Sequence, residues 1–132
     1  MASLHASAGH RAYFYLFERE VPGKGQASLG SFHSLELPYV FGALRQPIWT
    51  WLPFEETDHK LSEVVQGYWT NFAKTGSPNS TNLPEWREFE SRGQVAMEFG
   101  KNGTVALLKR SRPPYCDVDA ADLKTRLSST KQ

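Results

Sequence analysis

Residues 30–42 read Gly-Ser-Phe-His-Ser-Leu-Glu-Leu-Pro-Tyr-Val-Phe-Gly, and they place one histidine, His33, in a glycine-bounded loop between two recognisable elements. Upstream, the apolar aromatic run Ala12–Phe17 has the composition of a strand that is buried on both faces. Downstream, Pro38 sets φ for a short helical turn, which we expect to carry residues 39–41 into a core. Strand, loop, histidine and helix in this order are how α/β enzymes present a general base at the carboxyl end of a sheet.

A long amphipathic helix is predicted over Asp58–Thr75. Large apolar residues recur there at helical spacing and form one stripe that should face a core: Leu61, Val64, Val65, Tyr68 and Phe72. Thr57 or Asp58 can cap the start of this helix, and Gly76 can end it in the left-handed conformation.

The sequence also predicts a β-hairpin near the C-terminus. Two short apolar runs, Val95–Phe99 and Thr104–Leu108, are joined by Gly100-Lys101-Asn102-Gly103. Asn-Gly between such runs is a strong hairpin signal, because both residues tolerate positive φ. Residues 111–132 are polar and weakly patterned, so we expect a mobile tail there.

The remaining stretches give weaker signals. Residues 2–8 predict the end of a helix that Gly9 terminates. Residues 43–57 are rich in large apolar side chains but interrupted by prolines, which predicts a partly exposed loop. After the long helix, Trp86 and Phe89 are expected to tuck against it.

Several blocks, in order, resemble the C-terminal portion of the type-B carboxylesterases, the α/β-hydrolase family that includes para-nitrobenzyl esterases and cholinesterases. Residues 30–42 resemble the family's catalytic-histidine segment, and Ala12–Phe17 resembles the strand before it. Residues 58–86, which include the run NFAKTGSPN, resemble the family's final helix and loop. The resemblance implies an α/β class: a partial α/β-hydrolase fold with a terminal hairpin, in a single partial domain over residues 1–132.

The same resemblance implies that His33 is the base of a serine, histidine and acid triad in an enzyme that hydrolyses carboxylic esters. In this family the serine and the acid precede the histidine, so both are expected outside this chain. The sequence contains no Gly-x-Ser-x-Gly motif and no glycine-rich oxyanion motif. We therefore expect the isolated chain to be inactive, with Glu36 in a structural role and not as the triad acid.

The alternative is a non-catalytic interaction module, or a truncated remnant without activity of its own. A sheet that lacks neighbouring strands has open edges and apolar faces, which favour association. The expected partners are a small carboxylic ester in the complete enzyme, and either the missing N-terminal part of the hydrolase or a second copy of the chain.

Composition argues against several other classes. The 15 basic and 14 acidic residues give a net charge of +1 without a run of like charges, so nucleic acid is not an expected partner. No stretch approaches the ~20 apolar residues of a membrane span, and no secretory signal is recognisable, which leaves the compartment undetermined with a slight preference for the cytoplasm. One cysteine and four histidines without ligand spacing predict neither a metal site nor a cofactor.

Overall fold

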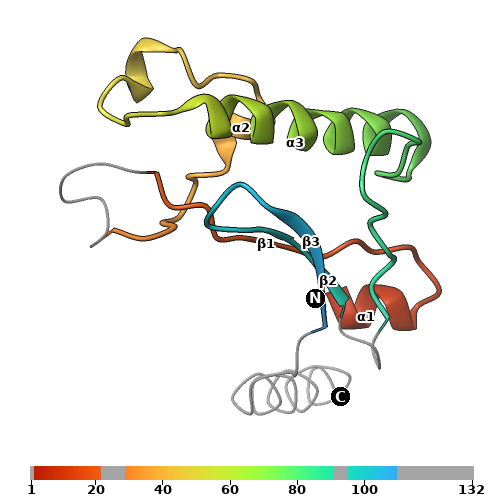
Figure 1. The fold of residues 1–132 in the computed structure, drawn as a ribbon. Coiled ribbons are helices and arrows are strands. Elements are labelled where there is room, and N and C mark those ends of the chain that lie inside the picture. The colour runs from red at the N-terminus through yellow and green to blue at the C-terminus, as the bar shows by residue number, and fades with distance from the viewer. Residues whose placement is uncertain (1, 22–28, 91–94, 110–132) are drawn as a thin grey trace, which may run out of the picture.

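The computed structural model describes residues 2–21, 29–90 and 95–109. In chain order these ranges contain α1 (Ala2–Ser7), β1 (Tyr15–Phe17), α2 (Leu37–Val40), the 3-10 helix η2 (Pro47–Trp49), α3 (Glu56–Thr75), β2 (Val95–Phe99) and β3 (Val105–Lys109). The long helix α3 lies across one face of a small sheet (Figure 1). The predicted α/β arrangement is therefore confirmed.

The described residues form one three-stranded sheet in the order β1-β2-β3. β1 runs parallel to β2, with Tyr15 opposite Met97, and β2 runs antiparallel to β3 as the predicted hairpin. A parallel pair needs a crossover connection, and here that connection contains α3, which packs back onto the sheet.

The predicted hairpin turn is closed by two backbone hydrogen bonds and one left-handed glycine. The Gly100 N–H donates to the Thr104 carbonyl at 2.8 Å, and the Gly103 N–H donates to the Gly100 carbonyl at 3.0 Å. Gly103 has a φ of +73°, whereas Asn102 does not adopt a positive φ. Of the two residues that tolerate positive φ, only Gly103 adopts it, because this turn needs one left-handed residue only. A side chain at Gly103 would also collide with Thr57 of α3.

β1 is shorter and more exposed than the sequence predicts. Only Tyr15–Phe17 form a strand, their side chains are half-buried, and the neighbouring Phe14 is 42% exposed. Within the described part of the chain, β1 pairs with a strand on one edge and meets a helix on one face. The prediction of burial on both faces was therefore wrong for this chain.

Helix α3 confirms the predicted helix but begins two residues earlier, at Glu56. Its N-cap residue is Glu55, whose backbone N–H donates to Oδ2 of Asp58 at 2.7 Å. The predicted cap at Thr57 or Asp58 was wrong, because Asp58 occupies the third helical position and reaches back to the cap. Gly76, with a φ of +72°, ends the helix as predicted.

The core lies between α3 and the sheet. It contains the buried residues Tyr39, Leu44, Leu61, Val65, Tyr68, Trp86, Met97 and Phe99. Phe72, the last member of the predicted stripe, is 49% exposed, because the end of α3 extends beyond the short strands (Figure 1). That part of the packing prediction was wrong.

The other predicted elements agree in part. Helix α1 is present, and Gly9 after it adopts the left-handed conformation. The loop after α2 is partly exposed as predicted, because the side chains of Ile48 and Trp51 lie at the surface. Phe41, expected in the core, is 75% exposed because α2 already ends at Val40.

Trp86 is buried against α3 as predicted, with its ring centroid 5.2 Å from that of Tyr68. Phe89 instead packs on Phe14, so the expected contact with α3 was wrong. The predicted tail at residues 111–132 lies outside the described residues.

A buried ion pair joins four segments of the fold. Nε and Nη2 of Arg19 donate to the two carboxylate oxygens of Asp58 at 2.7 and 3.2 Å. The Tyr39 hydroxyl donates to the same carboxylate at 2.7 Å, and Nη1 of Arg19 donates to the Lys101 carbonyl at 2.6 Å. The end of β1, α2, the start of α3 and the hairpin turn therefore meet at Asp58.

These contacts shift the pKa values of the groups that make them. Burial by itself raises the pKa of Asp58, but hydrogen bonds from Arg19, from the Glu55 N–H and from Tyr39 outweigh it, so this pKa lies below its usual range. Burial, followed by the hydrogen bond to Asp58, raises the pKa of the Tyr39 hydroxyl. Asp58 is thus the charged acceptor of the cluster and Tyr39 its neutral donor.

We predict that Asp58→Asn lowers the free energy of unfolding by ~3–5 kcal/mol, because Arg19 is then buried without its counter-charge. Urea denaturation of the two proteins measures the difference. Glu56→Gln is the matched control: it breaks only the exposed pair with Lys60, and a change below ~0.5 kcal/mol is expected. Equal losses in both variants would contradict the role of the buried pair.

A pH dependence follows from the lowered pKa of Asp58. The unfolded chain binds the proton near pH ~3.9, above the folded pKa, so stability from this group is complete above that pH. It is lost as the pH falls through the folded pKa. Urea titrations from about pH 7 to about pH 2 should show a steeper acid loss in the wild type than in Asp58→Asn. Parallel curves for the two proteins would show that Asp58 does not contribute.

Truncating two side chains of α3 should have unequal effects on stability, because Leu61 is buried and Phe72 is half-exposed. Leu61→Ala should cost ~2–5 kcal/mol, because this side chain is 2% exposed and leaves a cavity. Phe72→Ala should cost about 1 kcal/mol or less, since half of its surface is already in water. Thermal or urea unfolding measures both, and a larger loss for Phe72→Ala would overturn the assigned packing.

Candidate functional site

His33 is exposed on a turn, residues 33–36, between β1 and α2. The side chain of Leu35, two residues further on, is fully buried and anchors the turn to the fold. Within the described ranges, no hydrogen bond or ion pair involves the imidazole of His33. The turn therefore presents an imidazole at the surface that has no hydrogen-bond or ion-pair partner among the described residues.

Both ends of this loop are fixed to the fold. The Ser31 hydroxyl donates to the Phe17 carbonyl at the end of β1 at 2.7 Å. On the other side, the Ser62 hydroxyl of α3 donates to the Tyr39 carbonyl at 2.8 Å, and the Tyr39 hydroxyl binds Asp58. The position of His33 is thus set by β1 on one side and by α3 on the other.

The residue after His33 has an unusual backbone. Ser34 has a φ of +71°, and it is the one non-glycine residue with a positive φ in the part of the chain that the structure describes. Such a conformation costs of order 1–3 kcal/mol and persists where its surroundings enforce it, often at functional sites. The sequence alone gave no signal for this strain, because serine carries no preference for positive φ.

The nearby polar residues do not complete a catalytic set. Glu36 is half-buried. Burial of Tyr15 raises the pKa of its hydroxyl, and the negative charge of Glu36 raises that pKa further. Among the described residues, no serine hydroxyl and no carboxylate is hydrogen-bonded to His33. The assignment of His33 as a triad base therefore stays a prediction.

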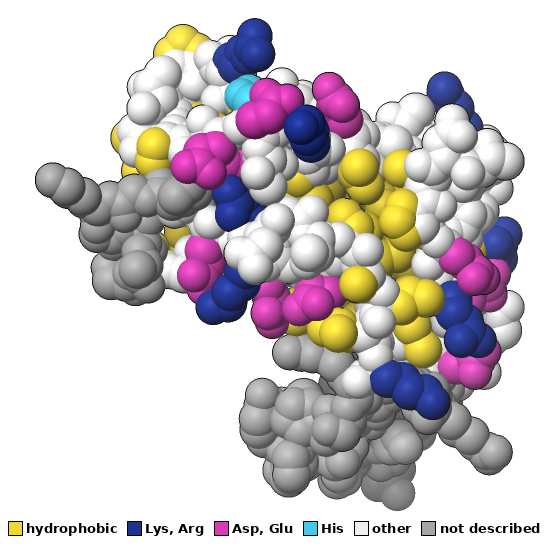
Figure 2. Space-filling model, viewed as in Figure 1, with side chains coloured by type: hydrophobic (Ala, Val, Ile, Leu, Met, Phe, Trp, Pro, Cys, Tyr) yellow, Lys and Arg dark blue, Asp and Glu magenta, His cyan; other side chains and the backbone are white. Residues whose placement is uncertain are grey.

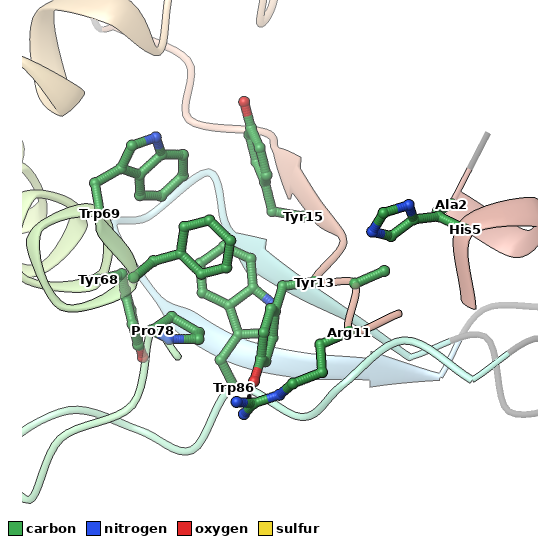
Figure 3. Close-up of a pocket in the computed structure, with 11 residues that line it drawn as sticks. Ala2, His5, Arg11, Tyr13, Tyr15, Tyr68, Trp69, Pro78 and Trp86 are labelled. Atoms are coloured by element: carbon green, nitrogen blue, oxygen red, sulfur yellow. Dashed lines mark hydrogen bonds between the residues drawn. The ribbon is translucent and has the colours of Figure 1, made fainter. Parts of the chain in front are cut away.

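An apolar pocket of about 490 Å³ lies between α1, β1 and α3 (Figure 3). Its lining includes Tyr13, Tyr15, Trp69, Phe72 and Trp86, and we call it the aromatic pocket. His33 does not line it. No sequence pattern singled out this pocket. Tyr13 and Tyr15, two apart in the extended segment that leads into β1, and Trp69 and Phe72, three apart on α3, could have indicated it, because each pair shares one face.

The described residues contain neither a metal-binding group nor a membrane-spanning helix. No three His, Cys, Asp or Glu side chains gather in these ranges as metal ligands. Among them no helix is both long and apolar enough to cross a bilayer. The rings of His5 and His10 stack at 4.8 Å and are exposed.

Comparisons with known proteins relate this chain to hydrolases and to neuroligins. The sequence profile described as "Carboxylesterase family" matches residues 1–116. Neuroligin-3 of Mus musculus is 42% identical over 118 residues, which are 75% of this chain and 14% of that protein. The medium-chain fatty acyl-CoA hydrolase precursor of Anas platyrhynchos is 35% identical over 94 residues, 68% of this chain and 16% of that protein.

The fold is similar to that of a solved enzyme, the carboxylesterase of Geobacillus stearothermophilus. The two structures have a TM-score of 0.65 and 30% sequence identity over 91% of this chain and 23% of the enzyme. The chain thus spans less than a quarter of the length of these relatives. By sequence and by structure, the chain belongs to the carboxylesterase family and forms a part of its α/β-hydrolase fold.

Proposed function

We propose that this chain is the part of a serine carboxylesterase that supplies the triad histidine, His33. The observation that supports the proposal is the exposed imidazole of His33, which has no partner among the described residues, on a turn that is fixed at both ends and contains the strained Ser34. A general base must meet a substrate yet be held in place, and this turn meets both needs.

In the proposed reaction His33 accepts and donates one proton in each of the two halves of the reaction. It accepts the proton of a serine hydroxyl while the serine oxygen attacks the ester carbonyl, and it then donates that proton to the departing alcohol oxygen. The acyl group is then bonded to the serine oxygen. His33 accepts a proton from a water molecule as the water oxygen attacks this acyl carbonyl, and donates the proton to the serine oxygen as the acyl–serine bond breaks and the carboxylic acid leaves. The serine, the oxyanion donors and the carboxylate that orients the imidazole would come from a segment outside this chain.

The names of the relatives support ester hydrolysis, but they also favour a second candidate. Two of the similar proteins are named as a carboxylesterase and as a fatty acyl-CoA hydrolase. The neuroligins, by contrast, carry a name that states no enzymatic activity. A non-catalytic interaction module is therefore the second candidate, and the exposed Phe41, Ile48 and Trp51 favour it.

A hybrid enzyme separates the two candidates. Residues 1–116 replace the matched segment of the Geobacillus stearothermophilus carboxylesterase, and hydrolysis of a para-nitrophenyl ester is followed. We expect His33→Ala to lower kcat by ~10³-fold or more, as losses of a triad base do. His59→Ala is the matched control on the polar side of α3, and it should leave kcat unchanged.

Two results would contradict the proposal. The first is a folded hybrid that keeps its turnover after His33→Ala, which would show that another group is the base. The second is turnover by the isolated chain together with stoichiometric labelling by a serine-directed organophosphate. That result would place the nucleophile within this chain, with Ser28, Ser31 and Ser34 as the first residues to examine.

A further inference from the structure

A pair of aromatic rings lies next to the turn that carries His33. The rings of Phe32 and Trp51 stack, with their centroids 6.0 Å apart and their planes at 25°. Phe32 directly precedes His33 in the chain, whereas Trp51 lies in the loop between η2 and α3. Two separate segments therefore meet at this pair, which we call the ring stack.

The backbone fixes the ring stack at the start of the turn. The Leu35 N–H donates to the Phe32 carbonyl at 3.2 Å, so residues 32–35 form a β-turn with His33 and Ser34 at its centre. Ser31, on the other side of Phe32, is held by its hydrogen bond to the end of β1. One residue therefore separates the ring stack from the exposed imidazole, and both neighbours of that residue pair are anchored.

The indole of Trp51 is held in place although it is exposed. Its Nε1 donates to the Ile48 carbonyl at 3.1 Å, and its ring lies against Phe32. The side chain is nevertheless 53% exposed. Figure 2 shows hydrophobic side chains at the surface of this loop, at the upper left. Because a large ring stabilises a fold mainly through burial, a fixed and half-exposed indole indicates a contact surface for another apolar group.

The ring stack and the His33 turn share one support. Leu35 of the turn and Leu52, which follows Trp51, are both buried in the same small hydrophobic cluster, and Phe32 packs against it. The Leu52 N–H also donates to the Trp49 carbonyl at 2.9 Å, which holds the loop close to this cluster. The positions of the imidazole and of the ring stack are thus set by one packed unit.

The proposed reaction determines which part of an ester comes near the ring stack. His33 donates a proton to the departing alcohol oxygen, so this oxygen must come within hydrogen-bonding distance of the imidazole. The acyl group, by contrast, becomes bonded to a serine from outside this chain. The alcohol part is therefore the part of the ester that lies nearest to the side chains beside His33.

The chemistry of the ring stack selects a neutral apolar group. The one polar atom of its two side chains is Nε1 of Trp51, and this atom already donates to the Ile48 carbonyl. The stack thus offers aromatic surface and no available hydrogen-bond donor. A flat ring on the alcohol can lie against the exposed part of the indole, which a short alkyl group covers only in part.

We propose that Phe32 and Trp51 are specificity-determining residues, which bind the alcohol part of the ester and favour a neutral aromatic alcohol over a short alkyl alcohol. The inference rests on the proposed function, because it takes His33 as the group that protonates the alcohol. It assigns the exposed Trp51 to the substrate and not to a protein partner. Neither side chain takes part in proton transfer.

Two esters with the same acyl group test this inference in the hybrid carboxylesterase. Benzyl acetate and ethyl acetate differ only in the alcohol, and the ratio of their kcat/KM values is measured. A change that affects the catalytic groups acts on both esters and cancels in this ratio. We expect Trp51→Ala to lower the benzyl-to-ethyl ratio by about tenfold, with ethyl acetate changed by about twofold or less.

Two further variants make the test specific. Trp51→Phe keeps a ring that can stack on Phe32, so it should keep the ratio within about threefold of that of the unsubstituted hybrid. Ile48→Ala is the matched control, because Ile48 is 71% exposed in the same loop and has no ring. The substitution keeps the carbonyl that accepts from Trp51, and the ratio should stay within about twofold.

A binding measurement separates this inference from the proposed function. Benzyl alcohol, the product, is titrated into the His33→Ala hybrid, and line broadening of its ring protons is followed by NMR. Trp51→Ala in this background should weaken binding by about tenfold, whether or not the hybrid hydrolyses esters. Turnover that survives His33→Ala counts against the catalytic role and leaves this binding result in place.

Three results would overturn the role of the ring stack. The first is an equal loss for both esters in Trp51→Ala, which would show that the indole only supports the fold. The second is a loss of the ratio in Ile48→Ala as large as that in Trp51→Ala. The third is binding of benzyl alcohol that Trp51→Ala leaves unchanged, or no binding of benzyl alcohol at all.

Discussion

The carboxylate of Asp58 is the constraint on which the rest of the structure depends. It is fully buried, and such a charge is tolerated only when its oxygens are paired. Arg19, Tyr39 and the Glu55 N–H supply the hydrogen bonds, and Arg19 continues to the carbonyl of Lys101. Because each of these groups belongs to a different segment, their relative positions are set together.

The position of His33 follows from that constraint. Tyr39 ties α2 to α3 through Asp58 and Ser62, and the turn that carries His33 enters α2 directly. Within the described residues, the same sheet and helix place β1 at an edge of the sheet and border the aromatic pocket. An exposed histidine on a turn anchored at both ends agrees with the role proposed for this chain in a carboxylesterase.

Sequence reasoning succeeded where short-range patterns decide the structure. The helical spacing and Gly76 predicted α3, and two apolar runs around Asn-Gly predicted the hairpin. It failed where contacts between residues far apart in the sequence decide the structure. The ion pair of Arg19 and Asp58 joins residues 39 positions apart, and no local sequence pattern indicates it. The exposure of Phe72 was also missed, because helical spacing identifies a face without saying how far its cover extends. His33 was chosen through the family resemblance, since a single loop histidine has no pattern of its own.

A crystal structure of the hybrid carboxylesterase, with its serine phosphonylated by a slow inhibitor, tests the central claim most directly. The account predicts that Nε2 of His33 lies within hydrogen-bonding distance, about 2.6–3.2 Å, of the serine oxygen. It also predicts a carboxylate from outside this chain at Nδ1. A structure in which another histidine contacts the serine, while His33 faces the solvent, would contradict the account.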